Sequence, residues 1–262
     1  MRALEGGTYL GTTARSFQAG GIIISQTHYR EKVYEGWHCH EHHHVSLLLK
    51  GGNTEHRKGT STVVGAGDVI YYRSGEVHRN VDTSHPSGNL NLEITSAFLE
   101  KYDLHFDTLE KFPAQVHRLK FALLQIYRAC SEGYTNPELA IQDYLLPVFS
   151  TPVVRHTTEP AWVIRLRELM HDRWNETLLL DEMSVITGVH PVTISRYFPH
   201  YFHCSLSEYQ RRIKIAQALI LVRETPLSLT AIAHHCGFFD QSHFIRTFKA
   251  CTGWLPRQFR EL

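Results

Sequence analysis

The sequence lacks long apolar runs, paired cysteine motifs and a marked net charge. No apolar run reaches the roughly 18 residues of a membrane-spanning helix, so we expect no membrane partner. The formal net charge is only +1, which by itself indicates neither nucleic acid nor any other charged partner. The five cysteines are scattered without a CxxC pair, and the first residues lack the layout of a signal peptide. These absences predict a cytoplasmic protein with reduced thiols.

A length of 262 residues suits two domains of ordinary size, and a hydrophobic content of 42% is enough for two cores. The first part contains short strand-like runs separated by Gly, Asn, Asp and Ser, which is typical of an antiparallel barrel or jelly roll. These runs are residues 21–25, 45–49, 61–64, 68–72 and 90–94. Two helices are expected next, over residues 113–130 and from 136 to about 149. A Pro- and Thr-rich linker follows.

The segment from Gly237 to Lys249 has the pattern of a helix, a turn and a second helix. Gly237 can supply the left-handed turn that ends one helix, and Asp240 can cap the next. Phe244 and Phe248, four residues apart, predict its buried face. An outer face of Gln, Ser, Ile and Arg makes this a helix-turn-helix pattern. For a single copy, an ordinary packed helical hairpin fits equally well.

A second copy upstream favours the DNA-binding interpretation. Met183 aligns with Ile232 at an offset of 49 residues, and Phe198 aligns with Phe248 at an offset of 50. An internal repeat of this period is hard to produce by chance. Between the copies, residues 207–223 predict one helix of roughly 25 Å, at about 1.5 Å per residue. Such a rod could hold two recognition helices about one DNA turn, roughly 34 Å, apart.

Two sets of residues lie where a known family has its signature. In the second copy they are Ile232, Ala233, Gly237, Phe238, Asp240, Gln241, Ser242, Phe244, Arg246, Phe248, Lys249, Gly253, Pro256, Phe259 and Arg260. In the first copy they are Gly188, Ser195, Arg196, Phe198, Ser205, Tyr209 and Arg212. Residues 161–262 thus resemble the C-terminal DNA-binding domain of AraC/XylS-type transcription regulators.

The first copy departs from the family pattern at three positions. His190 stands where a capping Ser is usual, and Pro199 stands where a basic residue is common. His203 replaces a turn Gly, so we expect it at positive φ with some strain. The missing phosphate-contacting Lys predicts that the first motif grips DNA more weakly than the second.

The outer faces of the two second helices supply the predicted DNA contacts. Arg can bridge guanine O6 and N7, Gln can bridge adenine N6 and N7, and Ile or Val can meet a thymine methyl group. The predicted DNA-binding residues are Val192, Thr193, Ser195, Arg196, Gln241, Ser242, His243, Ile245, Arg246 and Lys249.

A histidine-rich stretch, WHCHEHHH, occupies residues 37–44 in the strand-rich part. Strand residues alternate between faces, so four histidines share one face if the strand extends that far back. These are His38, His40, His42 and His44. His38, His40, His44 and Gly51 follow the spacing of the first cupin motif, with His44 in the position of Glu. Gly67, Gly75 and His78 follow the second motif, with Arg73 in the position of Pro.

The cupin resemblance implies an effector site, or a divalent metal site, at His38, His40, His44 and His78. Imidazole suits Zn, Fe, Ni and Cu. The alternative is a barrel that keeps these histidines without metal, and that uses them to bind a sugar or an acid or leaves them at its rim.

The expected fold class is α+β. A cupin-like antiparallel β-barrel is expected in residues 1–96, a helical pair in 97–150, a linker in 151–160 and an all-α double helix-turn-helix domain in 161–262. The apolar stripes of residues 113–149 predict a homodimer; alternatively, these helices only cover the barrel.

Three functions compete. The first is a sequence-specific transcription regulator that binds double-stranded DNA, responds to a small-molecule effector and acts with RNA polymerase. The second is a metal-dependent cupin enzyme fused to DNA-binding helices, and the third is a constitutive DNA-binding protein with a vestigial barrel. The repeat disfavours the enzyme, and the polar groups of the barrel favour the first function over the third.

Overall fold

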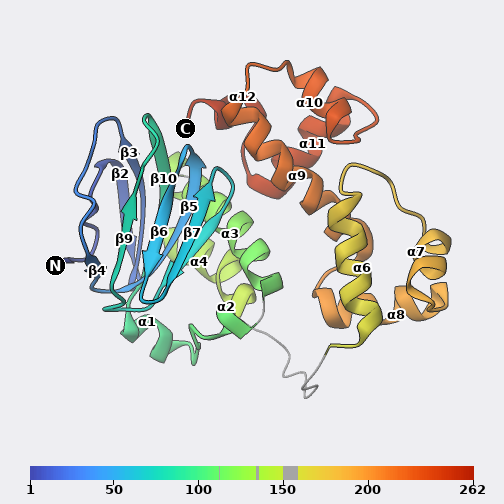
Figure 1. The fold of residues 1–262 in the computed structure, drawn as a ribbon, viewed down its shortest axis with the longest axis horizontal. Helices are drawn as coiled ribbons and strands as arrows, with labels where there is room; N and C mark the ends of the chain where they lie inside the picture. The colour runs from blue at the N-terminus through green and yellow to red at the C-terminus, as the bar shows by residue number, and fades with distance from the viewer. Residues whose placement is uncertain (112, 134–135, 150–158) are drawn as a thin grey trace. The chain divides into compact units, whose positions relative to one another are not determined.

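The computed structural model describes residues 1–111, 113–133, 136–149 and 159–262. The chain divides into two compact units, Met1–Thr151 with Thr252–Trp254 and Leu262, and Pro152–Cys251 with Leu255–Glu261. The described strands all lie in the first unit, and the second unit is helical (Figure 1). The α+β class is therefore confirmed. Most of the linker predicted for residues 151–160 lies outside the described residues.

The strands of the first unit form two five-stranded sheets, ordered β1-β4-β9-β6-β7 and β2-β3-β10-β5-β8. The described strands are β1 (Arg2–Leu4), β2 (Thr12–Ala19), β3 (Ile22–Tyr29), β4 (His38–His40), β5 (His43–Lys50), β6 (Gly52–Arg57), β7 (Thr60–Gly65), β8 (Val69–Tyr72), β9 (His78–Val81) and β10 (Ser87–Ile94). Neighbouring strands are antiparallel, except that β1 pairs with β4 in parallel.

The apolar runs that predicted strands form the core of this unit. Val45 and Leu47 of β5 and Leu90 and Leu92 of β10 are at most 1% exposed. Sequence patterning missed β1, β2, β6 and β9, and it anticipated β4 only as a backward extension of β5. Their residues are mostly polar, as in the TTARSFQA of β2, so they carry no strong apolar signal.

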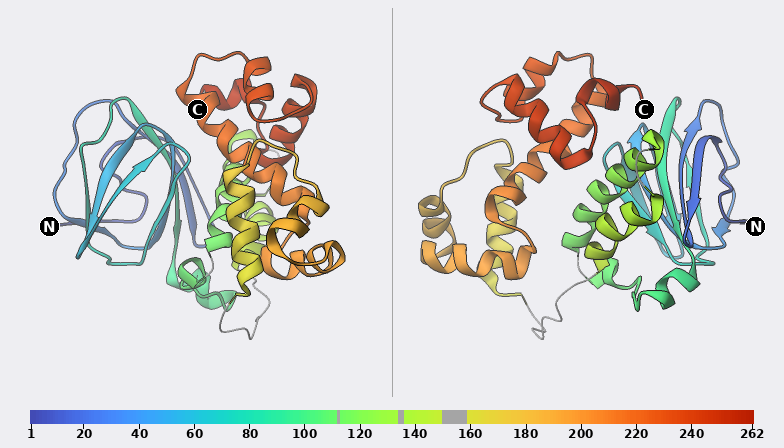
Figure 2. Two further views of the ribbon diagram at one scale, coloured as in Figure 1. Left: turned by 45° about the vertical axis from the view of Figure 1, so that its right-hand side comes forward. Right: turned by 180° about the vertical axis from the view of Figure 1, so that it is seen from behind.

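Helices follow the last strand and complete the first unit. They are α1 (Ser96–Lys101), α2 (Thr108–Lys111), α3 (Pro113–Glu132), α4 (Pro137–Tyr144) and α5 (Leu146–Phe149). Helix α3 packs against α4, α5 and β10, and Figure 2 shows α3 and α4 running together beside the strands. The apolar stripe of α3, including Leu119, Leu123 and Ile126, is buried. By contrast, α4 leaves Leu139 and Tyr144 exposed.

The second unit is built around one long helix. The described helices are α6 (Ala161–Asp172), α7 (Leu180–Thr187), α8 (Pro191–Phe202), α9 (Leu206–Glu224), α10 (Leu229–His235), α11 (Gln241–Thr252) and α12 (Pro256–Arg260). Helix α9 contacts α8, α10 and α12, and Ser205 caps it by accepting a hydrogen bond from the Glu208 backbone N–H. Its 19 residues exceed the predicted range of 207–223 by one at each end. None of the described helices is long and apolar enough to cross a membrane.

Candidate functional site

The second helix-turn-helix consists of α10, a turn and α11. Gly237 has φ 67°, in the left-handed region that favours glycine. The Oδ1 atom of Asp240 accepts a hydrogen bond from the His243 backbone N–H at 2.6 Å, which caps α11 as predicted. Phe244 and Phe248 are completely buried, so the predicted inner face is confirmed.

The outer face of α11 presents the residues predicted to read DNA. Ser242, His243, Arg246 and Lys249 are exposed, while Gln241 and Ile245 are half-buried. The hydroxyl of Thr230 on α10 donates to Gln241 Oε1 at 2.5 Å. This bond holds the Oε1 atom of Gln241 against Thr230, so the NH2 group of the amide points away from Thr230. Sequence reasoning missed Thr230, since nothing in its spacing marks it as a partner of Gln241.

The first motif consists of α7, a turn at Gly188 with φ 69°, and α8. Its inner face is formed by Ile194, Phe198 and Phe202, which are at most 1% exposed. On the outer face, Val192, Ser195 and Arg196 are exposed, and Thr193 is half-buried. The two motifs therefore present corresponding polar faces opposite corresponding buried Phe residues.

The three departures of the first motif have visible local consequences. His190 still caps α8, because its Nδ1 accepts a hydrogen bond from the Val192 backbone N–H at 3.3 Å. His203 ends the helix at φ 54°, the positive value that we expected. Pro199 lies inside α8 on the exposed side and offers no cation to a phosphate.

A buried lysine holds the turn of the second motif. Lys214 of α9 is only 7% exposed, and its Nζ donates to the Gly237 carbonyl oxygen at 2.9 Å. Burial lowers the pKa of Lys214 below its ordinary value. The sequence carries a signal for this residue that we overlooked: Lys214 stands between Ile213 and Ile215, within the most apolar part of α9.

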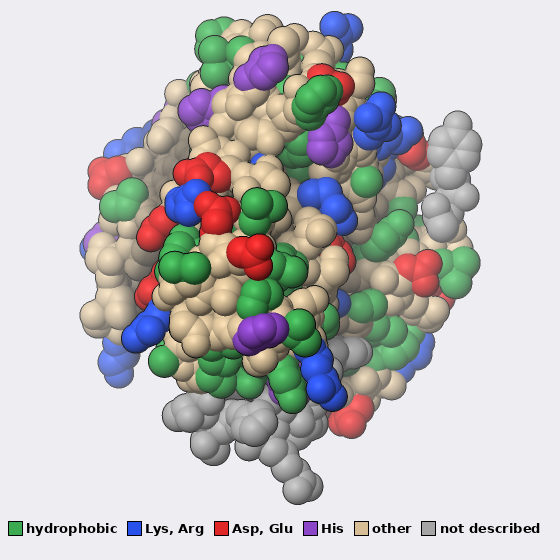
Figure 3. Space-filling view, turned by 90° about the vertical axis from the view of Figure 1, so that its right-hand side faces the viewer, with side chains coloured by type: hydrophobic (Ala, Val, Ile, Leu, Met, Phe, Trp, Pro, Cys, Tyr) green, Lys and Arg blue, Asp and Glu red, His purple; other side chains and the backbone are tan. Residues whose placement is uncertain are grey.

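Charges of both signs lie on the surface shown in Figure 3. Lys and Arg side chains are interspersed there with Asp, Glu and His side chains, so this face does not form a single basic patch. Positions of individual side chains on the recognition helices therefore matter more than net charge for the second unit.

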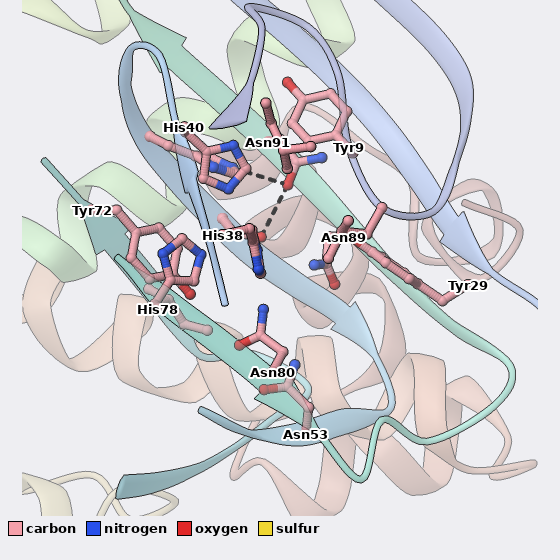
Figure 4. Close-up of a pocket in the computed structure, with 15 residues that line it drawn as sticks. Tyr9, Tyr29, His38, His40, Asn53, Tyr72, His78, Asn80, Asn89 and Asn91 are labelled. Carbon is pink, nitrogen blue, oxygen red and sulfur yellow. Dashed lines mark hydrogen bonds between the residues drawn. The ribbon is translucent and has the colours of Figure 1, made fainter. Parts of the chain in front are cut away.

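In the first unit, four buried histidines meet between the two sheets. His38 of β4 lies directly opposite His78 of β9, and His40 follows on β4. His44 comes from β5 in the other sheet. Figure 4 shows His38, His40 and His78 around the same space, with Tyr72 stacked on His78. His42 does not join them, because β4 ends at His40 and β5 begins at His43, which interrupts the alternation.

The structure brings three of the four predicted ligands into metal-binding proximity. His38, His40 and His78 each offer a ring nitrogen, and these atoms lie within 4.8 Å of one another. His44, the fourth predicted ligand, lies outside this group of three. His44 lies beside the group, with ring centroids 4.0 Å from those of His40, and its Nε2 is 3.4 Å from Asn91 Oδ1. Asn91 therefore contacts His44, whose ring packs against His40 beside the group.

Backbone carbonyls fix two of the imidazole rings in the orientation that metal ligands need. His38 Nδ1 donates to the Gly36 carbonyl at 3.1 Å, and His78 Nδ1 donates to the Glu76 carbonyl at 3.0 Å. Each bond places the proton on Nδ1 and leaves the Nε2 lone pair for a ligand. The Nε2 of His78 is buried with no hydrogen-bond partner. A metal ion would satisfy it, so the donor set fits a divalent metal.

Burial keeps these histidines neutral. Loss of hydration lowers the pKa of His38 and His40, and the neighbouring histidines lower that of His40 further. Burial also lowers the pKa of His44 to about 4 and that of His78 to about 3. Neutral imidazole is the form that binds a metal ion, so no proton has to be removed near pH 7.

The histidines line an inner cavity of about 30 Å³, and a wider surface hollow of about 680 Å³ lies beside it. Leu4 and His40 line both spaces. The inner cavity is otherwise surrounded by Tyr9, Leu10, Tyr29, Ser46, Asn53, Ile70, Tyr72, Asn80, Asn89 and Asn91, together with the other three histidines. The amides were missed by sequence reasoning, which followed the histidines alone.

Comparisons with known proteins agree with the geometry of the second unit. Residues 183–262 match the family described as a helix-turn-helix domain. The HTH-type transcriptional regulator GbdR of Pseudomonas aeruginosa (strain UCBPP-PA14) is 32% identical over 93 residues, which cover 36% of this chain and 25% of GbdR. The chain thus spans a quarter of that relative. The HTH-type transcriptional activator RhaS of Enterobacter sp. (strain 638) is 21% identical over 241 residues, or 86% of this chain and 87% of RhaS.

Two solved structures are similar to parts or most of this chain. The C-terminal domain of AraT, a response regulator from Geobacillus stearothermophilus, is 26% identical, covers 39% of this chain and 85% of that one, and has a TM-score of 0.37. Apo ToxT from Vibrio cholerae is 12% identical, covers 93% and 98%, and has a TM-score of 0.39. The motif residues and the family match identify residues 183–262 as a helix-turn-helix domain of the AraC/XylS type.

Proposed function

We propose that this protein is a sequence-specific DNA-binding transcription regulator. The observation that carries the proposal is the duplicated recognition helix: α8 and α11 each bury a Phe face and expose a polar face. A helix of this kind can place its exposed residues against base edges in the major groove. Two copies joined by α9 can read two successive segments of one duplex. A protein that acts on bacterial-type operators in this way works in the cytoplasm.

The predicted base contacts divide into reading and anchoring residues. Arg246 and Gln241 are proposed to read bases in the second motif, with Gln241 oriented by Thr230. Arg196 and Val192 take the corresponding role in the first motif. Lys249, exposed at the C-terminal part of α11, is proposed to contact phosphate instead. Ser195, Thr193, Ser242, His243 and Ile245 complete the two proposed interfaces.

Arg246→Ala tests this assignment. We expect it to weaken binding to a cognate duplex by about 1–3 kcal/mol and to leave binding to random duplexes nearly unchanged. Lys249→Ala is the matched control, because losing a phosphate contact should weaken both complexes alike and lower the salt slope by about one. Both variants are titrated with both duplexes at several fixed salt concentrations. Equal losses on cognate and random DNA for Arg246→Ala would show that Arg246 contacts phosphate.

The first unit is proposed to be the sensor. The inner cavity and the hollow beside it supply a place for a small-molecule effector, bordered by His38, His40, His44 and His78. We further propose that His38, His40 and His78 hold a divalent metal ion, with His44 beside it. The carrying observation is the buried, unpartnered Nε2 of His78. The ion would supply Lewis acidity and charge to the site; the chain orients the imidazoles and excludes water around them.

The sensor proposal requires a link between effector and DNA. An effector shifts the equilibrium only if it binds the DNA-competent state with a different affinity from the other state. We expect His40→Ala to abolish the effector response and to release metal, while DNA binding is retained. Elemental analysis and DNA titrations, each with the wild-type protein alongside, measure these effects independently. An effector response that survives in His40→Ala would place the sensor site elsewhere.

Two partners and one alternative complete the proposal. We propose a homodimer through α4, since its Leu139 and Tyr144 remain exposed whereas the stripe of α3 is used within its own unit. RNA polymerase is the proposed partner on the promoter. A metal-dependent enzyme is the second candidate, favoured only by the three grouped imidazoles. The helix-turn-helix match and the regulator relatives favour regulation instead.

A further inference from the structure

The barrel cavity offers a metal ion neutral ligands only. His38, His40 and His78 are the grouped ligands, and all three are buried. No Asp, Glu, Lys or Arg is among the described residues that line the inner cavity. A divalent ion held there would receive no negative charge from the residues that line this cavity. Burying charge is unfavourable, so an anion bound directly to the metal would stabilise the site.

Asparagine amide groups line the cavity and can donate hydrogen bonds to such an anion. Asn53 and Asn80 line the cavity, and the Oδ1 atom of each is buried with no hydrogen-bond partner. Figure 4 shows the amides of Asn80 and Asn89 directed toward the space beside His38. An amide carries two N–H donors, and its oxygen and nitrogen exchange places by a flip of the group. These side chains can therefore turn donors toward an anion bound at the metal.

We propose that the cavity binds a divalent metal ion together with the carboxylate of a small organic acid. This inference rests on the metal site of the proposed function and names the class of effector that completes it. A carboxylate is flat, carries one negative charge and accepts several hydrogen bonds, so it cancels part of the metal charge and satisfies the amides.

Size also selects a small carboxylate. The inner cavity of about 30 Å³ leaves room for few atoms besides the metal. A phosphate group is larger and more highly charged, and the lining of this cavity supplies it with no Lys or Arg. The hollow of about 680 Å³, which shares Leu4 and His40 with the inner cavity, is the nearest space for the remaining atoms of the acid.

The two ligands must then strengthen each other. Metal and carboxylate in contact share one coupling free energy, so each raises the affinity of the other by the same factor. We expect a factor of roughly 10 or more, within the 5–150-fold range typical of coupled sites. Without metal, four neutral imidazoles and several amides offer a carboxylate no cation, so acid alone should bind only weakly.

The test measures zinc binding to the metal-stripped full-length protein by equilibrium dialysis and elemental analysis at pH 7.5. Zinc is titrated in sodium acetate, sodium chloride or sodium phosphate at equal ionic strength, with correction for zinc bound by each buffer anion. Acetate should raise the zinc affinity roughly tenfold over chloride. Asn80→Ala should lose most of this gain, whereas Asn175→Ala, an asparagine outside the barrel, should retain it.

Each other result overturns the inference at a defined point. Equal zinc affinity in acetate and chloride refutes the accompanying carboxylate but leaves the proposed metal site standing. An equal gain in phosphate refutes selection of a carboxylate, and a gain that persists in Asn80→Ala places the anion outside this cavity. If the wild-type protein binds no more zinc than His40→Ala, the metal site itself fails. The DNA titrations of Arg246→Ala do not depend on the metal site, so they test the proposed regulator function separately.

Discussion

Gly237→Ala is expected to destabilise the second unit far more than Gly188→Ala. The two glycines hold corresponding positions in the two helix-turn-helix motifs, and their φ angles are 67° and 69°. Their surroundings differ sharply. A Cβ added at Gly237 would lie 1.7 Å from the backbone oxygen of Asn175, whereas nothing lies within 4 Å of a Cβ added at Gly188. The pair therefore separates backbone strain from steric overlap.

The magnitudes follow from these two contributions. Left-handed backbone costs about 1–2 kcal/mol for a residue with a Cβ, and both variants incur it. Gly237→Ala must also displace the Asn175 backbone, and overpacking of this kind costs roughly 1–3 kcal/mol. The added Cβ would also lie 3.1 Å from Lys214 Nζ and so disturb its hydrogen bond to Gly237, whose charged donor makes it worth about 1.5–3 kcal/mol. We expect losses of about 1–2 kcal/mol for Gly188→Ala and roughly 3–5 kcal/mol or more for Gly237→Ala.

Urea unfolding of the full-length chain, followed by the helical circular dichroism signal at 25 °C, measures both losses. Gly188→Ala is the matched control, since it has the same substitution, the same backbone region and open space. Losses that agree within about 0.5 kcal/mol, the usual scatter of independent surface changes, would refute the reasoning. The close contact between Asn175 and the Gly237 turn would then not exist in solution.

Three further outcomes are expected. Phe248→Ala should lower the free energy of unfolding by about 3–5 kcal/mol by leaving a cavity, and an unchanged urea midpoint would mean that α11 faces the other way. Leu139→Glu should convert the proposed dimer to a monomer in sedimentation at tens of micromolar protein, and a wild-type monomer under those conditions would exclude a dimer through α4. Finally, His44 and His78 have folded pKa values of about 4 and about 3, below the ordinary 6.5. As the pH falls, these histidines are therefore protonated in the unfolded chain before they are protonated in the folded protein. The free energy of unfolding should be constant above pH 6.5 and should decrease as the pH drops toward 4, by about 1.4 kcal/mol per pH unit for each histidine. Urea midpoints of the metal-free protein from pH 7.5 to 5 measure this, and a flat profile would contradict the burial of both rings.

The second helix-turn-helix could be predicted almost completely because its signals are local. Gly237, Asp240, Phe244 and Phe248 act within one turn and one helix, so their spacing alone specifies the turn, the cap and the buried face. Lys214 and Thr230 act across elements that are distant in sequence. Only the packing of α9 and α10 against the turn reveals that they position Gly237 and Gln241.

The histidine site could be predicted only in part. His38, His40 and His78 meet because β4 and β9 are neighbours in one sheet, which motif spacing anticipated. The sequence did not reveal that the strand breaks between His40 and His43, which removes His42 from the site. It also did not show that Asn91, on the neighbouring strand β10 of the same sheet, contacts the ring of His44. Such contacts between strands depend on long-range pairing, which alternation along a single strand cannot specify.

The alternation of β4 has a practical consequence for studying this site. Cys39 lies between two buried histidines, yet it is half-exposed and lines the outer hollow rather than the inner cavity. A thiol-reactive fluorophore attached there would stand on the opposite face of the strand that carries His38 and His40. Cys130, Cys204 and Cys236 are buried, and replacing the half-buried Cys251 would confine labelling to this position. The natural sequence thus already carries an attachment point from which occupancy of the barrel can be followed optically in real time.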